Sequence, residues 1–161
     1  MRSAARSARS ARLVTFVAIA TLALSACGED KKDDEKGLTT KPKVEVPSGD
    51  PPTTLEKKDI SVGTGAEAAA GQKVSVQYVG VAYSTKKQFD ASWDRGAEPF
   101  NFTLGAGGVI PGWDQGVPGM KVGGRRQLVI PPDLAYGPEG YPPLIGQNET
   151  LVFVVDLVSV G

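Results

Sequence analysis

The aromatic side chains are the groups whose types and spacing point most directly to a chemical site. The chain holds only two Trp, four Tyr and five Phe, and most of them fall in a few short motifs, chiefly Val109-Ile110-Pro111-Gly112-Trp113. Aromatic residues bury large areas and often form an ordinary core. Their order here predicts instead a pocket with aromatic walls and few ionisable groups. Its expected members are Tyr78, Phe89, Asp90, Phe100, Trp113, Tyr136 and Phe153.

The residues that the sequence lacks restrict the chemistry of such a pocket. The chain has no histidine, which excludes Ser-His-Asp and Cys-His catalysis and every His-ligated metal site. Cys27 is the only cysteine, so neither an intrachain disulfide nor a cysteine cluster can form. Gly105-Ala106-Gly107-Gly108 begins like a dinucleotide-binding fingerprint, but Ile110 stands where the third glycine is needed. We therefore expect no metal, no cofactor and no covalent intermediate.

Alternating apolar residues predict the strands that must position these side chains. Val74, Val76 and Tyr78 alternate with polar residues, as expected for a strand with one buried face. The same period of two predicts that Arg126, Leu128 and Ile130 share a face. In a final strand, about Thr150 to Val160, the shared face consists of Leu151, Phe153, Val155 and Leu157. Weaker strands are expected over residues 55–62, 89–92 and 100–104.

Helix is scarce in the sequence, and one segment is a good candidate. Pro111 favours a first helical turn, and the helix should end near Val117 because glycine and proline follow. A long loop is expected from Pro131 to Asn148, and it is too apolar for simple disorder. The predicted fold class is therefore α+β, an antiparallel sheet wrapped around one short helix. The apolar residues of the long loop are Tyr136, Tyr141, Leu144 and Ile145.

The first 26 residues resemble a secretory signal. Four arginines precede an apolar run from Leu13 to Leu24, and this run is too short for a membrane span of roughly 20 residues. Leu24-Ser25-Ala26-Cys27 resembles the lipobox of bacterial lipoproteins, in which the signal is cut before the cysteine and the cysteine is lipidated. The alternative is an ordinary signal peptide with an incidental cysteine. We expect an extracytoplasmic protein, anchored through Cys27 to the bacterial cell membrane.

Two further regions follow the predicted signal. Residues 27–52 are rich in mixed charge and proline, which predicts a disordered tether that holds the domain roughly 25–30 Å from the membrane. Residues 53–161 suffice for one domain with a single core. Removing residues 1–26 takes away four arginines and no acidic residue, so the remaining chain is acidic. This charge argues against nucleic acid as a partner.

Taken in order, the motifs between about Leu55 and Val160 resemble the FKBP-type peptidyl-prolyl cis-trans isomerases, the family bound by macrolide immunosuppressants. Each motif alone is weak evidence, but their order and spacing together are specific. The motifs are Val76-Gln77-Tyr78-Val79-Gly80, Phe89-Asp90-Ala91-Ser92, Pro99-Phe100, Val109-Ile110-Pro111-Gly112-Trp113, Pro132-Asp133-Leu134-Ala135-Tyr136-Gly137 and Thr150-Leu151-Val152-Phe153.

The resemblance implies a half-barrel of five to six antiparallel strands around the helix, with an apolar pocket between them. By the family's motifs, Trp113 forms the floor, and the catalytic set is Asp90, Ile110, Tyr136 and Trp113, with the main-chain N–H of Ile110 gripping the ligand carbonyl. The implied partners are Pro-containing polypeptide clients and macrolide inhibitors, and the implied state is a monomer. The implied substrate-binding residues are Tyr78, Phe89, Arg95, Phe100, Val109, Tyr141, Leu144, Ile145 and Phe153.

The sequence also departs from the family pattern at the pocket rim. Tyr141 stands where the best-known members carry histidine, and Gly146-Gln147 stands where many have two prolines. The Ser92-to-Pro99 loop, which contains Arg95, is about one residue longer than in the small eukaryotic members. The function expected from the resemblance is isomerisation of X–Pro bonds in exported proteins by non-covalent stabilisation of the twisted amide. The alternative is a module that binds Pro-containing segments without turnover.

Overall fold

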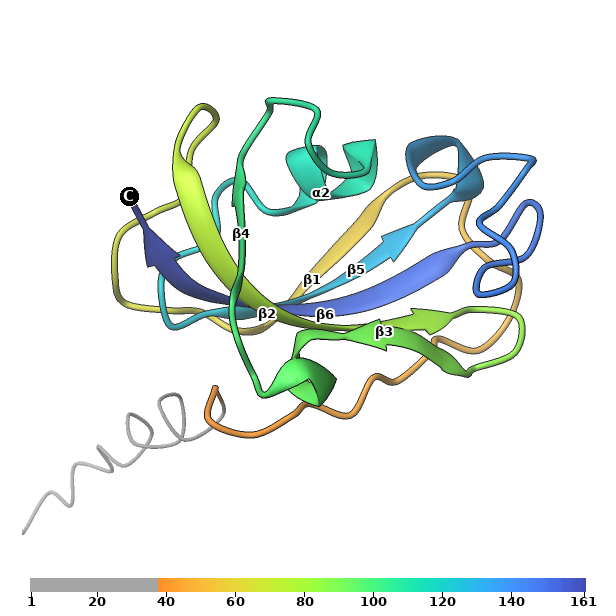
Figure 1. Ribbon diagram of the computed structural model, residues 1–161, viewed down its shortest axis with the longest axis horizontal. Helices are drawn as coiled ribbons and strands as arrows, with labels where there is room; N and C mark the ends of the chain where they lie inside the picture. Colours follow the sequence, from red (N-terminus) through yellow and green to blue (C-terminus); the bar gives the residue numbers. More distant parts are fainter. Residues whose placement is uncertain (1–37) are drawn as a thin grey trace, which may run out of the picture.

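The computed structural model describes residues 38–161, and within them it shows one antiparallel sheet of six strands with a single α-helix packed on it (Figure 1). The predicted α+β fold class is therefore confirmed. None of the helices in this range is long and apolar enough to span a membrane. The elements are β1 (Glu56–Ser61), β2 (Lys73–Ala82), β3 (Gln88–Ala91), η1 (Ser92–Arg95), β4 (Phe100–Thr103), α2 (Pro111–Gly116), β5 (Arg125–Ile130), η2 (Pro132–Leu134) and β6 (Leu151–Val160).

Strand β2 organises the sheet because it pairs with three other strands. The strand order is β1-β5-β6-β2-β3, and every pair is antiparallel. One edge of β2 pairs with β6 over nearly its whole length. Its other edge is shared: Lys73–Val76 pairs with β4, and Val79–Val81 pairs with β3. The chain between β3 and β4, which contains the 3-10 helix η1, therefore leaves and rejoins the same strand.

The inner face of the sheet forms the main core with α2. Leu128 and Ile130 of β5 and Leu151, Val155 and Leu157 of β6 are all 0% exposed. The predicted period of two is confirmed for these strands. Burying one such side chain stabilises the fold by about 1.5–3 kcal/mol, so this face contributes much of the stability of the fold.

Helix α2 lies close against β5. Pro111 occupies its first turn, as predicted. A Cβ at Gly112 would collide with the side chain of Ile130, so glycine is required for this approach. The guanidinium of Arg126 donates to the carbonyls of Gly116 (2.9 Å) and Pro118 (3.2 Å) at the end of the helix. These contacts fix both the position and the end of the element that carries Trp113.

Residues 38–52, here called the N-terminal strap, lie along the outer face of the sheet, on the side opposite α2 (Figure 1). Val44 and Val46 pack against buried outer-face residues of the sheet. Side chains of β5 hold the strap backbone, because Gln127 donates to the Glu45 carbonyl (3.0 Å) and Arg125 donates to the Thr40 carbonyl (3.1 Å).

This packing corrects the expectation that a disordered tether extends to residue 52. Two alternating valines meet an apolar outer face, and their burial contributes to offsetting the entropy of ordering the segment, together with the hydrogen bonds from Gln127 and Arg125. The predicted signal, Cys27 and the predicted tether up to residue 37 lie outside the described residues.

The other differences from expectation concern short elements. The strand and helix limits differ by one residue or so from those predicted. The two 3-10 helices, η1 and η2, were not anticipated, because three or four residues show no usable periodicity. The long loop after β5 is ordered by η2 and by an isolated bridge between Tyr141 and Ile145.

Candidate functional site

An open cavity of about 180 Å³ lies between α2 and the inner face of the sheet. Its volume is several times the roughly 30 Å³ that one water molecule occupies in the liquid. The domain's own side chains therefore leave the hollow open. The residues that line it are Tyr78, Phe89, Asp90, Phe100, Gly108, Val109, Ile110, Trp113, Tyr136 and Phe153.

The indole of Trp113 forms the floor of this cavity and is 4% exposed. Its ring meets those of Tyr78 and Phe153 edge-on, at centroid distances of 5.1 and 5.3 Å. Phe100 and Phe102 of β4 approach at 6.1 and 5.6 Å. Edge-to-face packing of this kind is favourable beyond the area it buries. The floor is therefore held by rings from three strands.

Gly80 of β2 makes room for two of the walls. Phe89 and Phe153 meet edge-on, with their centroids 5.5 Å apart. A Cβ at position 80 would lie 2.6 Å from Cζ of Phe89 and 2.7 Å from Cε1 of Phe153. Only glycine lets both rings lie over the strand in this arrangement.

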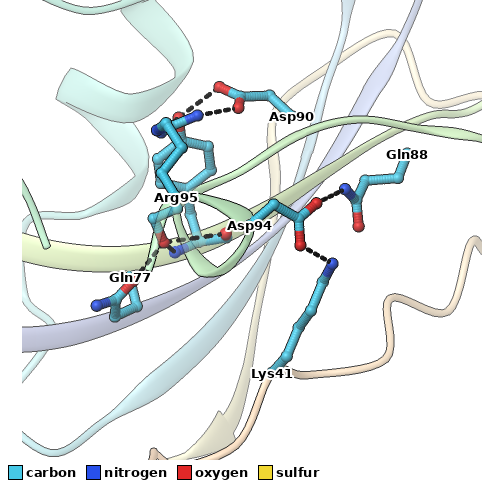
Figure 2. Close-up of polar contacts among 8 residues, drawn as sticks. Lys41, Gln77, Gln88, Asp90, Asp94 and Arg95 are labelled. Carbon is cyan, nitrogen blue, oxygen red and sulfur yellow. Dashed lines mark hydrogen bonds and ion pairs between the residues drawn. The ribbon is translucent and has the colours of Figure 1, made fainter. Parts of the chain in front are cut away.

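A polar cluster lies at one edge of the cavity. Figure 2 shows its hydrogen bonds and ion pair. The hydroxyl of Tyr78 donates to Oδ2 of Asp90 at 2.5 Å and accepts from Nη2 of Arg95 at 2.8 Å. Arg95 also forms an ion pair with Asp90. Burial, followed by the hydrogen bond to Asp90, raises the pKa of Tyr78 to about 12. The phenol therefore remains neutral, and its hydrogen-bonding capacity is used within the protein.

Some donors at the cavity have no partner among residues 38–161, and one of them is the buried indole N–H of Trp113. The main-chain N–H of Ile110 precedes α2 and donates to no group in this range, although the Ile110 carbonyl accepts from the N–H of Trp113 at 2.9 Å. The hydroxyl of Tyr136 likewise has no partner there, and burial raises its pKa, with smaller contributions from Tyr141 and Asp90. A ligand carbonyl in the cavity could accept from either group.

The turn that leads into Ile110 is fixed from the helix. The carboxylate of Asp114 accepts from the N–H groups of Gly105 (2.8 Å) and Gly107 (3.1 Å). The glycine cluster thus forms a turn and not a cofactor-binding loop. Asp114 and Gly108 were not anticipated as part of the site, and only the fold shows their closeness to it.

The structure brings nine of the thirteen predicted pocket residues to the cavity lining. Arg95 pairs with Asp90 outside the lining, and the ring of Tyr141 lies tilted against that of Tyr136, with their centroids 5.7 Å apart. Leu144 is 55% exposed on the same loop. Ile145 is instead 3% exposed and belongs to the main core, outside the cavity lining.

Comparison with known proteins agrees with this geometry. Residues 65–158 match the family model of the FKBP-type peptidyl-prolyl cis-trans isomerase. The chain belongs to this family. It is an isomerase of X–Pro peptide bonds, and the sequence-based expectation of this activity is confirmed.

Two bacterial relatives match nearly over their whole length. An FK506-binding protein of Streptomyces anulatus is 61% identical over 121 residues, which cover 74% of this chain and 97% of the relative. A probable FK506-binding protein of Corynebacterium glutamicum is 56% identical over 120 residues, covering 74% and 98%. Both alignments are longer than the stretch from Thr53 to Gly161, so the similarity extends into the strap.

A solved structure shows the same fold. The crystal structure of AtFKBP13 aligns with a TM-score of 0.62 and 39% identity, covering 69% of this chain and 96% of that one. The FKBP-like arrangement of sheet and helix expected from the sequence is therefore confirmed.

Proposed function

We propose that the cavity over Trp113 is where the isomerase lowers the barrier to X–Pro rotation. The barrier of about 18–20 kcal/mol arises from amide resonance. A twisted amide has lost this resonance and is less dipolar than a planar one. An apolar cavity disfavours the planar form relative to the twisted one, so catalysis is differential binding. The observation that supports this proposal is an open cavity with an indole floor, where the N–H of Ile110 and the hydroxyl of Tyr136 have no partner among residues 38–161.

The polar groups at the cavity have separate roles in this mechanism. The N–H of Ile110 and the hydroxyl of Tyr136 hold carbonyl oxygens of the bound segment and orient the proline ring over Trp113. Asp90, with Arg95 and Tyr78, forms the edge at which the amide enters. None of these groups transfers a proton. Raising a rate of about 0.01 per second to about 100 requires only about 5–6 kcal/mol, a range that desolvation and a few hydrogen bonds supply.

The exposed end of the long loop supports a role in gripping the substrate chain. Tyr141 and Leu144 are 57% and 55% exposed beside Tyr136. Residues flanking proline would lie against them. The names of the bacterial relatives add a second ligand: those proteins are described as FK506-binding. We extend macrolide binding at this cavity to the present chain.

A protease-coupled isomerisation assay tests the catalytic proposal. The mature chain, residues 27–161, is expected to accelerate cis-to-trans exchange of a Leu-Pro tetrapeptide, and FK506 is expected to inhibit it. Trp113→Leu removes the floor and should lower kcat/KM at least tenfold. The control is Val62→Ser, since Val62 is 63% exposed and away from the cavity. A Trp113→Leu variant that is folded and fully active would refute the proposed site.

We further propose that the isomerase acts outside the cytoplasmic membrane on exported proteins, anchored by a lipid on Cys27. The motif Leu24-Ser25-Ala26-Cys27 after a basic and apolar segment supports this proposal. Mass spectrometry of the native N-terminus should find a diacylglyceryl-modified Cys27. Cys27→Ser should release the protein from the membrane fraction. An unmodified N-terminus at any other residue would refute lipid anchoring.

A further inference from the structure

The strap is linked to the edge of the active site by an apolar contact. Val44 and Val46 pack in the same cluster as Trp93, together with Val79 and Val81 of β2. Trp93 belongs to η1, the short segment between β3 and β4. The strap therefore covers not only the sheet but also the segment from which Arg95 extends.

A second, polar link lies beside the first. Nζ of Lys41 in the strap lies 2.5 Å from Oδ1 of Asp94, and Nε2 of Gln88 lies 2.6 Å from Oδ2 of the same carboxylate (Figure 2). Asp94 is thus a shared anchor for the strap, η1 and β3. These bonds, chiefly the one from Lys41, lower the pKa of Asp94.

Arg95 extends from this anchored segment and is otherwise held through its guanidinium. Its side chain is 53% exposed, and its contacts are with Asp90 and Tyr78. The start of η1 is fixed from β2, since buried Ser92 accepts from the N–H of Tyr78 at 2.9 Å. The two residues between Ser92 and Arg95 are Trp93 and Asp94. Asp94 pairs with Lys41 of the strap, and Trp93 packs against the same buried cluster as the two strap valines.

We propose that the strap is a functional part of the isomerase domain that fixes η1, and that Lys41 and Asp94 are positioning residues for Arg95. Docked on the outer face, the strap keeps the guanidinium of Arg95 against Asp90 and Tyr78 at the mouth of the cavity. Neither Lys41 nor Asp94 lines the cavity. The matched family model begins at residue 65, whereas the two bacterial alignments extend into the strap. The strap and its contacts with η1 thus lie outside the part of the chain that the family model matches.

The first test removes the polar link in the mature chain. Lys41→Gln and Asp94→Asn should each lower kcat/KM for a Leu-Pro tetrapeptide about twofold to fivefold, as expected for a partly exposed ion pair. Lys41→Arg should retain the wild-type value. Lys43→Gln is the matched control, since Lys43 lies two residues away and shows no ion pair among residues 38–161. Unchanged kcat/KM in both variants would overturn the proposal.

A double-mutant cycle separates positioning from general stability. If Lys41 acts through Arg95, then Lys41→Gln should have no further effect once Arg95→Gln is present. A purely structural contribution would persist in that background, and the same loss there would overturn the proposal. Urea unfolding of each variant establishes that activity is compared among folded proteins.

The second test releases the apolar link. Val44→Ser/Val46→Ser should undock the strap and lower kcat/KM about tenfold, whereas Val62→Ser should not. With 5-fluorotryptophan, the 19F resonance of Trp93 reports docking separately from that of Trp113. The Trp93 resonance should move toward the position of a solvent-exposed indole. An undocked strap with wild-type kcat/KM would overturn the proposal, as would a Trp93 resonance that does not move.

Discussion

At the scale of single residues, the site is defined by which polar groups the fold leaves unpaired. Tyr78 and Tyr136 are both tyrosines at the cavity, yet their hydroxyls differ. The hydroxyl of Tyr78 is used by Asp90 and Arg95, while that of Tyr136 has no partner among residues 38–161. The first is a structural group at the cavity edge, and the second is available to a ligand.

Tyr136→Phe tests that distinction. The free energy of unfolding should remain within about 0.5 kcal/mol of wild type, because no hydrogen bond is lost within the domain. The affinity for FK506 should fall about fivefold to tenfold, as expected for one lost hydrogen bond. Calorimetric titration measures the affinity. Tyr141→Phe, the same change on the neighbouring ring outside the lining, should leave affinity nearly unchanged. Equal losses in the two variants would contradict the assignment.

Gly80→Ala tests the walls of the cavity. The new methyl group would press on both Phe89 and Phe153, at 2.6 and 2.7 Å. Overpacking of this kind costs about 1–3 kcal/mol. We expect lower stability in urea together with a large loss of isomerase activity. Gly108→Ala is the control at the same cavity, since a Cβ there meets nothing within 4 Å. A fully active Gly80→Ala variant would show that the walls tolerate displacement.

The sequence predicts the aromatic residues of the site because aromatic spacing is a strong local pattern. It could not show why position 80 must be glycine, since the clash that requires glycine involves rings from β3 and β6. It did not separate Ile145 from Leu144, because a loop sequence does not show which of two adjacent apolar side chains turns inward. Leu144 is exposed and Ile145 is buried.

At the scale of elements, the outer face of the sheet explains what the strap does for stability. Val152, Val154 and Asp156 alternate on β6 opposite the main core, and all are 0% exposed. The carboxylate of Asp156 receives two bonds from Arg125, at 2.5 and 2.7 Å. The alternation in the sequence identified the inner face of β6 alone. The docking of the strap on the outer face was therefore not predicted from the sequence.

Asp156→Ala tests the buried ion pair. It removes the partner of Arg125, whose side chain is only 12% exposed. Breaking a buried pair on one side costs about 3–5 kcal/mol, and we expect a loss of this order in urea unfolding. Asp133→Ala is the control, because Asp133 is exposed and has no hydrogen bond or ion pair shown among residues 38–161. A loss below about 1 kcal/mol in Asp156→Ala would contradict this account.

The link between the strap and η1 predicts a pH effect. The Lys41 ammonium depresses the pKa of Asp94 in the folded state, so the carboxylate stabilises the fold above its ordinary pKa. This contribution is lost as the pH falls through the depressed value. In Lys41→Gln, the pKa of Asp94 should move back up toward its ordinary value. Titration of the Asp94 side-chain carbon by NMR measures it, and an unchanged pKa would contradict the contact.

At the scale of the whole molecule, the functional unit begins before the segment that the family model matches. A chain truncated to residues 53–161 keeps the cavity but loses Val44 and Val46, and it exposes apolar residues of the outer face. We expect a stability loss of about 2–3 kcal/mol from the lost burial. A chain of residues 38–161 should have the same free energy of unfolding as a chain of residues 27–161. Urea unfolding of the three chains measures this, and equal stability of all three would contradict the role of the strap.

With the lipid that we propose on Cys27, the docked strap would also limit how far the isomerase can reach. Only the ten residues Gly28 to Gly37 would lie between the bilayer and the first described residue. Even fully stretched, ten residues extend no more than about 35 Å. Had the strap been free to residue 52, the limit would have been about 85 Å. With the strap docked, the anchored enzyme would act only close to the bilayer surface, where it would meet polypeptides as they leave the export machinery.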